Sequence, residues 1–163
     1  MAILPAIQQM VKFAYLNLVD DELCAHNQAS AQALALFARA CANQGQLTEA
    51  RQWCEQAIAA DRLDARLHFL LATILQEQDA LDDAVLALKR ALYLDQHFVL
   101  AHLTLGTLEL RQGKCKAAAK HFETVLALLS AYRPHEVLPE SDGMTAARLR
   151  EIVASMYQQH TTQ

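Results

Sequence analysis

The chain has 163 residues, of which 53% are hydrophobic and 20% charged, and this balance excludes a chain too polar to build a core. The formal net charge is −4 and the lysines and arginines are scattered, which argues against a nucleic-acid-binding surface. Only three prolines and four glycines occur, which is typical of a mostly helical protein. The composition therefore predicts one mostly helical domain.

The first 29 residues form an apolar N-terminal segment. It has no basic region at its start and Lys12 interrupts it, so it resembles neither a signal peptide nor a membrane span. Val11, Phe13 and Tyr15 alternate with other residues in a strand-like way. An unpaired apolar strand would invite association, so three outcomes stay open: disorder, docking back onto the chain, or pairing with another molecule. We favour disorder or helical docking.

Residues 30–130 contain three copies of one pattern, offset by 34 residues, at 31–64, 65–98 and 99–132. Small residues recur in two matched columns: Ala50, Ala84 and Ala118 in one, and Ala38, Ala72 and Gly106 in the other. A fixed period of this length indicates stacked helical hairpins. The columns are small because two helices that cross at short distance leave no room for a large side chain.

A loop and a last helix follow the repeats. Pro134 and Pro139 fall within residues 131–143, which we therefore predict to be a loop. Residues 144–159 place Leu149, Ile152, Val153 and Met156 on one helical face. Because the last unit of an array needs a cover for its apolar edge, this helix is predicted to be a cap.

Four cysteines, Cys24, Cys41, Cys54 and Cys115, have neither a CxxC pairing nor a metal-like spacing to histidine. Cys41 and Cys54 fall in core columns of the first repeat, where a thiol acts as a small hydrophobe. We expect reduced structural thiols, no metal site and a cytoplasmic location.

The repeat columns resemble the tetratricopeptide repeat (TPR), which ends in an A-x3-F pattern. The run from Ala118 to Phe122 meets this ending, and the other two copies meet it with substitutions. The aromatic residue usual near the start of the first helix is absent, as is the closing proline. The resemblance implies an all-α fold, a right-handed superhelical array of three TPR hairpins with a C-terminal capping helix, and a role in protein–protein interaction.

Proteins of this family bind peptides in a concave groove lined by the first helix of each hairpin. By position, the groove residues would be Arg39, Asn43, Arg66, Phe69, Thr73, Glu77, Leu103, Thr107 and Arg111. The three arginines could together hold an acidic peptide, because guanidinium pairs with carboxylate in a bidentate way. The alternative is three solvated surface arginines, and both interpretations stay open.

His68 and His102 stand in the same column of neighbouring repeats. Such residues lie about 10 Å apart, the packing distance of adjacent helices. A shared metal ion requires ligands at about 2 Å from it. We therefore expect histidines at the edge of the core and no metal.

A narrower resemblance covers the stretches Ala91–Asp95, Phe98–His102 and Leu138–Leu149. They are similar to the repeat region that follows bacterial chemotaxis-type protein methyltransferases (the CheR family). Val11–Leu18 is similar to a strand of that family's S-adenosylmethionine-dependent domain, where Asn17 and Leu18 would correspond to a pair beside the adenosine. The glycine-rich turn and the doubly wound sheet of the catalytic domain are missing, so we expect neither catalysis nor a bound cofactor.

The sequence thus predicts a non-enzymatic TPR module of bacterial chemotaxis-type signalling that binds a peptide or protein in its groove. Nucleic acid and membrane are not expected as partners. One alternative is a fragment of an S-adenosylmethionine-dependent protein-glutamate methyltransferase that keeps part of its cofactor site. Another is a structural module that forms homodimers or larger homo-oligomers.

Overall fold

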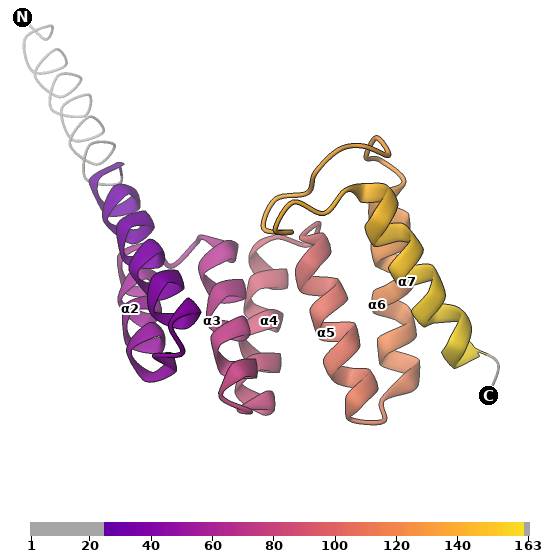
Figure 1. The fold of residues 1–163 in the computed structure, drawn as a ribbon, viewed down its shortest axis with the longest axis horizontal. Helices are drawn as coiled ribbons and strands as arrows, with labels where there is room; N and C mark the ends of the chain where they lie inside the picture. The colour runs from indigo at the N-terminus through magenta and orange to yellow at the C-terminus, as the bar shows by residue number, and fades with distance from the viewer. Residues whose placement is uncertain (1–24, 162–163) are drawn as a thin grey trace, which may run out of the picture. The chain divides into compact units, whose positions relative to one another are not determined.

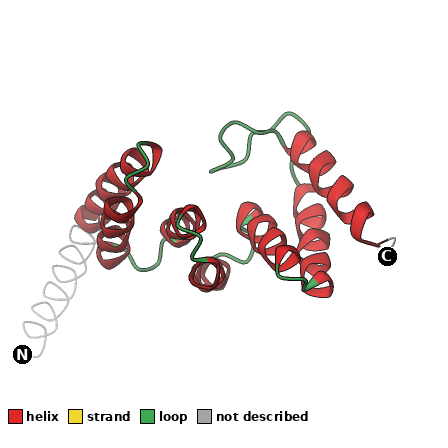
Figure 2. Cartoon of the chain, turned by 60° about the horizontal axis from the view of Figure 1, so that its bottom comes forward, coloured by secondary structure: helices red, strands yellow, loops and turns green. Residues whose placement is uncertain are grey.

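The computed structural model describes residues 25–161, and this part of the chain consists of helices joined by turns and loops (Figures 1 and 2). The strand-like stretch around Val11–Leu18, with Asn17 and Leu18, lies outside the described residues. The predicted all-α class is confirmed for the described part. An isolated antiparallel bridge joins Val137 to Thr145. Within residues 25–161, none of the helices has the length and apolar character needed to cross a membrane.

The chain divides into two compact units, and the first ends at Arg62. Its described part is a helix over residues 25–43, a turn at Gly45 and helix α2, Leu47–Ala60. Gly45 has a φ of +77°, which explains why a glycine stands in this turn. Residues 25–29, which the sequence placed in the N-terminal segment, are part of the first helix. This helix is rich in alanine, the residue that favours helix most strongly.

The first hairpin buries its small columns but leaves an aromatic residue beside them exposed. Ala38 and Ala50 are fully buried, whereas Phe37 is 58% exposed and contacts Trp53 with ring centroids 5.7 Å apart. The equivalent residue of the third repeat, Leu105, is buried. Leu105 lies on a helix that packs against the preceding repeat, and within the described residues no repeat precedes Phe37.

The described part of the second unit, Leu63–Gln163, contains five helices. They are α3 (Ala65–Glu77), α4 (Leu81–Leu94), α5 (Val99–Arg111), α6 (Cys115–Leu129) and α7 (Ala146–Thr161). α3 packs on α4 and α5 packs on α6, while α4 contacts α5 and α6 contacts α7 (Figure 1). These pairs are the hairpins expected for the second and third repeats, and α7 is the expected cap.

α5 and α6 approach each other closely at Gly106 on α5. A Cβ atom built on Gly106 would lie 2.8 Å from Cε1 of Phe122 and 3.2 Å from Cβ of His121. Phe122 is almost fully buried, and so is Ala118 one turn before it on α6. The small column predicted from the repeat period is therefore a steric requirement of this crossing.

The capping helix α7 buries Leu149 and Val153 completely. Arg150 reaches back to α6, where its Nη2 donates to the carbonyl oxygen of Leu129 at 2.7 Å and satisfies an end group of that helix. In the preceding loop, the hydroxyl of Ser141 donates to the carbonyl oxygens of Leu138 and Met144. α6 ends at Leu129 and α7 begins at Ala146, so the loop extends slightly beyond the predicted residues 131–143 at both ends.

The cysteines differ more in burial than the sequence indicated. Cys54 is fully buried, and burial, helped by the nearby charge of Glu55 and opposed by that of Arg39, raises its pKa to about 12. Cys41, expected in a core column, is only half-buried, and Cys115 is exposed. Cys54 is therefore the one of these three with the character of a structural thiol.

Asp64 fixes the start of α3. Its Oδ1 accepts the backbone N–H of Arg66 at 2.9 Å, which makes it the N-cap of the helix. Burial would raise the pKa of Asp64, but hydrogen bonds from the side chain and backbone of Arg66, with the charges of Arg66 and His68, together lower it below its ordinary 3.8.

Replacing Gly106 with alanine tests the steric account of the crossing. Overpacking costs about 1–3 kcal/mol, whereas helix propensity returns about 1 kcal/mol, so we expect Gly106→Ala to lower the free energy of unfolding by roughly 1 kcal/mol. In a Phe122→Leu background the added methyl group has room, and the same change should be neutral or stabilising. Urea denaturation of the four variants measures both effects. A stabilising Gly106→Ala in the wild-type background would contradict the account.

Removing the Asp64 side chain tests the N-cap. Asp64→Ala should cost about 1 kcal/mol of unfolding free energy at pH 7. The pKa of Asp64 is lowered in the folded chain, so its ionised form stabilises the fold above the ordinary value of 3.8 and this contribution fades as the pH falls below it. The difference between wild type and Asp64→Ala should therefore shrink by pH 3. Asp64→Asn, which keeps an acceptor oxygen without the charge, should lose less at pH 7. A cost independent of pH would show that the charge of Asp64 does not contribute.

Candidate functional site: the α3–α5 face

Seven of the nine predicted groove residues belong to the second unit and follow one face of two helices. Four lie on α3 and three on α5: Arg66, Phe69, Thr73, Glu77, Leu103, Thr107 and Arg111. Their spacing of three or four residues keeps each set on one side of its helix. All seven side chains are half-buried or exposed, in contrast to Leu70, Ile74 and Leu105, which are buried. We call these seven residues the α3–α5 face.

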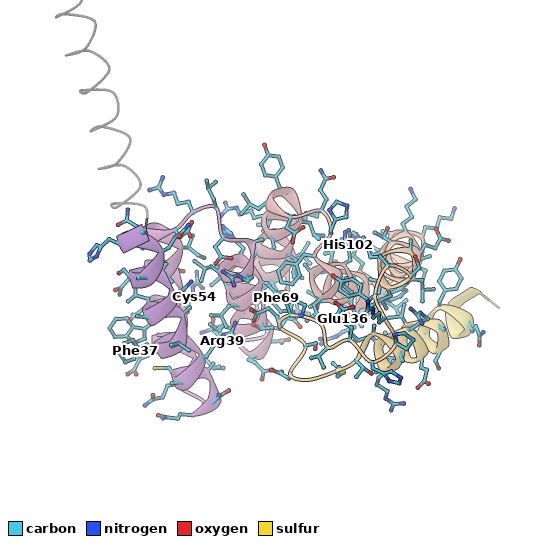
Figure 3. The ribbon with its side chains drawn as sticks, turned by 90° about the horizontal axis from the view of Figure 1, so that it is seen from above. Phe37, Arg39, Cys54, Phe69, His102 and Glu136 are labelled. Atoms are coloured by element: carbon cyan, nitrogen blue, oxygen red, sulfur yellow. The ribbon has the colours of Figure 1, made fainter. Side chains whose placement is uncertain are left out.

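An aromatic contact joins α3 to the start of α5. The ring of Phe69, on the face, lies 5.0 Å from the ring of Phe98, measured between centroids. Phe98 is the N-cap residue of α5 and is buried. This contact ties the two first helices of neighbouring repeats to each other (Figure 3 labels Phe69). The half-buried Phe69 and Leu103 therefore present apolar surface on a fixed framework.

Thr73 and Thr107 occupy equivalent positions one repeat apart and are held in the same way. The hydroxyl of Thr73 donates to the carbonyl oxygen of Leu70 at 2.7 Å, and that of Thr107 to the carbonyl oxygen of Leu103 at 2.6 Å. A hydroxyl bonded back to its own helix has used its donor. What each threonine still offers to a ligand is a methyl group and an oxygen acceptor.

The charged residues of the face are not equivalent. Arg66 already contacts Asp64 through two side-chain hydrogen bonds, from Nη2 to Oδ2 at 2.7 Å and from Nε to Oδ1 at 3.0 Å. Arg111 is exposed in the last turn of α5, and Glu77 is exposed at the end of α3. The sequence treated the arginines as one set, but a ligand carboxylate would have to share Arg66 with Asp64. The D-x-R spacing was the signal that could have shown this pairing.

The remaining two predicted residues, Arg39 and Asn43, are exposed on the helix over residues 25–43 of the first unit. The two histidines considered for a metal pair are on α3 and α5: His68 is buried and His102 is half-buried. Among the described residues, no group of three or more His, Cys, Asp or Glu side chains is placed to hold a metal ion.

Sequence reasoning missed a polar cluster inside the third hairpin. It consists of His102 and Glu109 on α5 and His121 on α6 (Figure 3 labels His102). The signal was present in the repeat alignment, because Glu109 stands in the column where the second repeat has the buried Leu75. A carboxylate in an otherwise apolar column requires a partner.

Comparisons with known proteins agree with this architecture. The family model of the tetratricopeptide repeat matches residues 43–97. No curated protein sequence matches the chain.

Several solved structures have the same fold. The type III secretion chaperone SycD of Yersinia enterocolitica, in complex with a peptide of the translocator YopD, superposes with a TM-score of 0.69 at 15% identity, over 80% of this chain and 92% of that one. The TPR domain of Arabidopsis OM64 gives a TM-score of 0.64 at 20% identity, over 82% and 98%. The second TPR of Spaghetti (RPAP3), bound to an HSP90 peptide, gives 0.62 at 26% identity, over 66% and 98%. The repeat columns, the packed hairpins and the matched segment thus agree in showing a fold of the tetratricopeptide-repeat type.

Proposed function

We propose that the chain is a non-enzymatic interaction module that binds a peptide segment of a partner protein on the α3–α5 face. The observation that carries the proposal is the surface of that face. Phe69 and Leu103 lie on the first helices of two repeats, and both apolar side chains are partly exposed to solvent. A polar residue could stand at either of these positions. Two of the structures similar to this chain, SycD and the second TPR of Spaghetti, hold peptides of other proteins.

The chemistry of the face favours a ligand with an apolar centre. Phe69, Leu103 and the methyl groups of Thr73 and Thr107 offer no hydrogen-bond donor, so they suit apolar side chains of a peptide. We further propose that an acidic group of the ligand pairs with Arg111. Arg39 and Asn43 are proposed as ligand-contacting residues of the first repeat, taken by itself.

The sequence resemblance to chemotaxis-type methyltransferases supports a narrower proposal, a role in bacterial chemotaxis-type signalling in the cytoplasm. It rests on Ala91–Asp95, Phe98–His102 and Leu138–Leu149. Under the alternative of a methyltransferase fragment, Asn17 and Leu18 would contact S-adenosylmethionine. Titration of the chain with that cofactor separates the two, because saturable binding would favour the fragment.

One observation favours a second function, self-association through the first hairpin. Leu36 is 68% exposed and Phe37 58% exposed, next to each other on the helix over residues 25–43. Exposed apolar side chains that adjoin are typical of interaction sites. If the chain forms a homodimer through this surface, light scattering should show that Phe37→Glu converts the dimer to a monomer. Glu49→Gln on α2 should leave the dimer intact. A monomeric wild-type chain would exclude this function.

The α3–α5 face can be tested with two matched threonines. Thr107 lies on the face, whereas Thr124 lies on α6 and bonds back to its own helix in the same way, to the carbonyl oxygen of Lys120 at 2.9 Å. Peptides are first selected from a random displayed library against the wild-type chain, and their affinities are then measured by fluorescence anisotropy. We expect Thr107→Lys to weaken binding at least about tenfold, because it places a charge against an apolar ligand surface.

Thr124→Lys is the control and should change the affinity less than about twofold. Circular dichroism of both variants should match the wild type. Equal losses in the two variants, or no loss in Thr107→Lys, would place the binding site elsewhere. Arg111→Ala, measured with peptides that carry an acidic residue and with their neutral counterparts, tests the carboxylate contact separately.

A further inference from the structure

The third hairpin combines three polar side chains that occur together in neither of the other two hairpins. The His102 column holds Leu34 and His68 in the first two repeats, and the His121 column holds Trp53 and Ala87. The Glu109 column holds Cys41 and Leu75. Only the third repeat therefore combines two imidazoles and a carboxylate at these positions. They lie beside the tight crossing, since Cβ of His121 is one of the atoms nearest to Gly106.

The two imidazoles contact each other directly across the hairpin. Nδ1 of His102 lies 2.9 Å from Nδ1 of His121, the length of a good hydrogen bond. The ring centroids are 5.2 Å apart, which exceeds the nitrogen separation by about one ring diameter. The two nitrogens therefore face each other head to head, which is the arrangement of a nearly straight hydrogen bond.

The same distances exclude a metal ion between the two nitrogens. A metal ion binds imidazole nitrogen at about 2 Å, so an ion on the line between the two atoms would separate them by about 4 Å. The observed gap of 2.9 Å has room for one hydrogen atom. The two imidazoles are therefore joined by a hydrogen bond, with one hydrogen atom between the two nitrogens.

Neighbouring acceptors determine which nitrogen carries that proton. Nε2 of His102 lies 3.0 Å from the carbonyl oxygen of Gln96, which can only accept, so this nitrogen must carry a hydrogen. Neutral His102 then has a bare Nδ1 that accepts. The donor across the hairpin is consequently Nδ1–H of His121, and Nε2 of neutral His121 is bare.

The bare Nε2 of His121 lies 3.7 Å from Oε2 of Glu109, too far for a hydrogen bond. That carboxylate oxygen is buried and has no hydrogen-bond partner among residues 25–161. Glu109 attracts a proton to this end of the cluster, but the burial of His121 opposes a charge on it. Burial lowers the pKa of His121 below its ordinary 6.5, and the charge of Glu109 opposes this shift while those of His102 and Lys89 add to it.

We propose that His102 and His121 form a proton-dependent link between α5 and α6, which holds the third hairpin closed at neutral pH and breaks in acid. His121 takes its added proton on Nε2, on the side of Glu109, which leaves the hydrogen bond between the two Nδ1 atoms intact. The bond breaks once His102 is also protonated, because both imidazoles then carry a hydrogen on Nδ1 and the two N–H groups oppose each other at a distance that allows only one hydrogen. The rings must then separate beside the close approach at Gly106. The other charged groups that act on His121 are Glu109 on α5 and Lys89 on α4. From α7, the hydroxyl of Tyr157 donates a hydrogen bond to Glu123 on α6.

The direction of the pH effect follows from the burial of His121. Its pKa is lower in the folded chain than its ordinary 6.5, so the unfolded chain binds a proton at a higher pH than the folded chain does. The stability due to neutral His121 is complete above 6.5 and is lost as the pH falls below that value. Acid therefore lowers the stability of the fold through the burial of His121, and it breaks the link between the two rings once Nδ1 of His102 also carries a hydrogen.

Long-range proton–nitrogen NMR of the histidine side chains tests the link in the unaltered chain. At pH 7.5 we expect His102 in the Nε2–H tautomer and His121 in the less common Nδ1–H tautomer, with signals assigned from His102→Gln and His121→Gln. Exposed His97 and His135 serve as internal references for the Nε2–H form that free imidazole prefers. The Nε2–H tautomer at both His102 and His121 would overturn the proposal.

Thermal unfolding at pH 7.5 and pH 5.5 provides the second measurement. The midpoint of the wild type should fall more over this range than that of His121→Gln, by on the order of 3 °C. His97→Gln is the matched control and should keep the full wild-type pH dependence. Equal falls for wild type and His121→Gln would show that His121 does not sense pH.

Discussion

The close crossing of two helices at small residues is the constraint on which each hairpin depends. Ala72 and Ala84 in the second repeat, and Gly106 and Ala118 in the third, are buried at these crossings. Because the helices approach so closely, large residues such as Leu88 and Phe122 must fill the space beside the contact, and they are almost fully buried. The 34-residue period exists because each hairpin meets this steric requirement in the same way.

The α3–α5 face is a consequence of this packing. α4 and α6 bury Ala84, Leu88, Ala118 and Phe122 against their neighbouring helices, and α7 covers the end at α6. α3 and α5 each keep one side open, with Phe69 and Leu103 half-buried on it. The contact between Phe69 and Phe98 and the N-cap at Asp64 hold that side in place. Stability and the proposed binding surface thus involve different sides of the same helices.

The repeat period predicted the elements of this fold because each repeat obeys the same packing rule. The sequence also placed seven groove residues on the sides of α3 and α5 that remain accessible. It did not predict how these residues interact, since the pairing of Arg66 with Asp64 depends on the local backbone at a helix start. The exposure of Phe37 and the contact of His102 with His121 were also missed, because a column describes what repeats share and these residues show where single repeats differ.

The most direct test of the account is to map where a peptide binds. Backbone amide signals of the chain are followed by NMR while a selected peptide is added at saturating concentration. The account predicts that the largest shifts fall on α3 and α5, around Phe69, Thr73, Leu103 and Thr107, and that the exposed side of α4, around Leu86 and Tyr93, remains unchanged. Shifts concentrated on α4 or α6 would contradict the assignment of the α3–α5 face as the binding site.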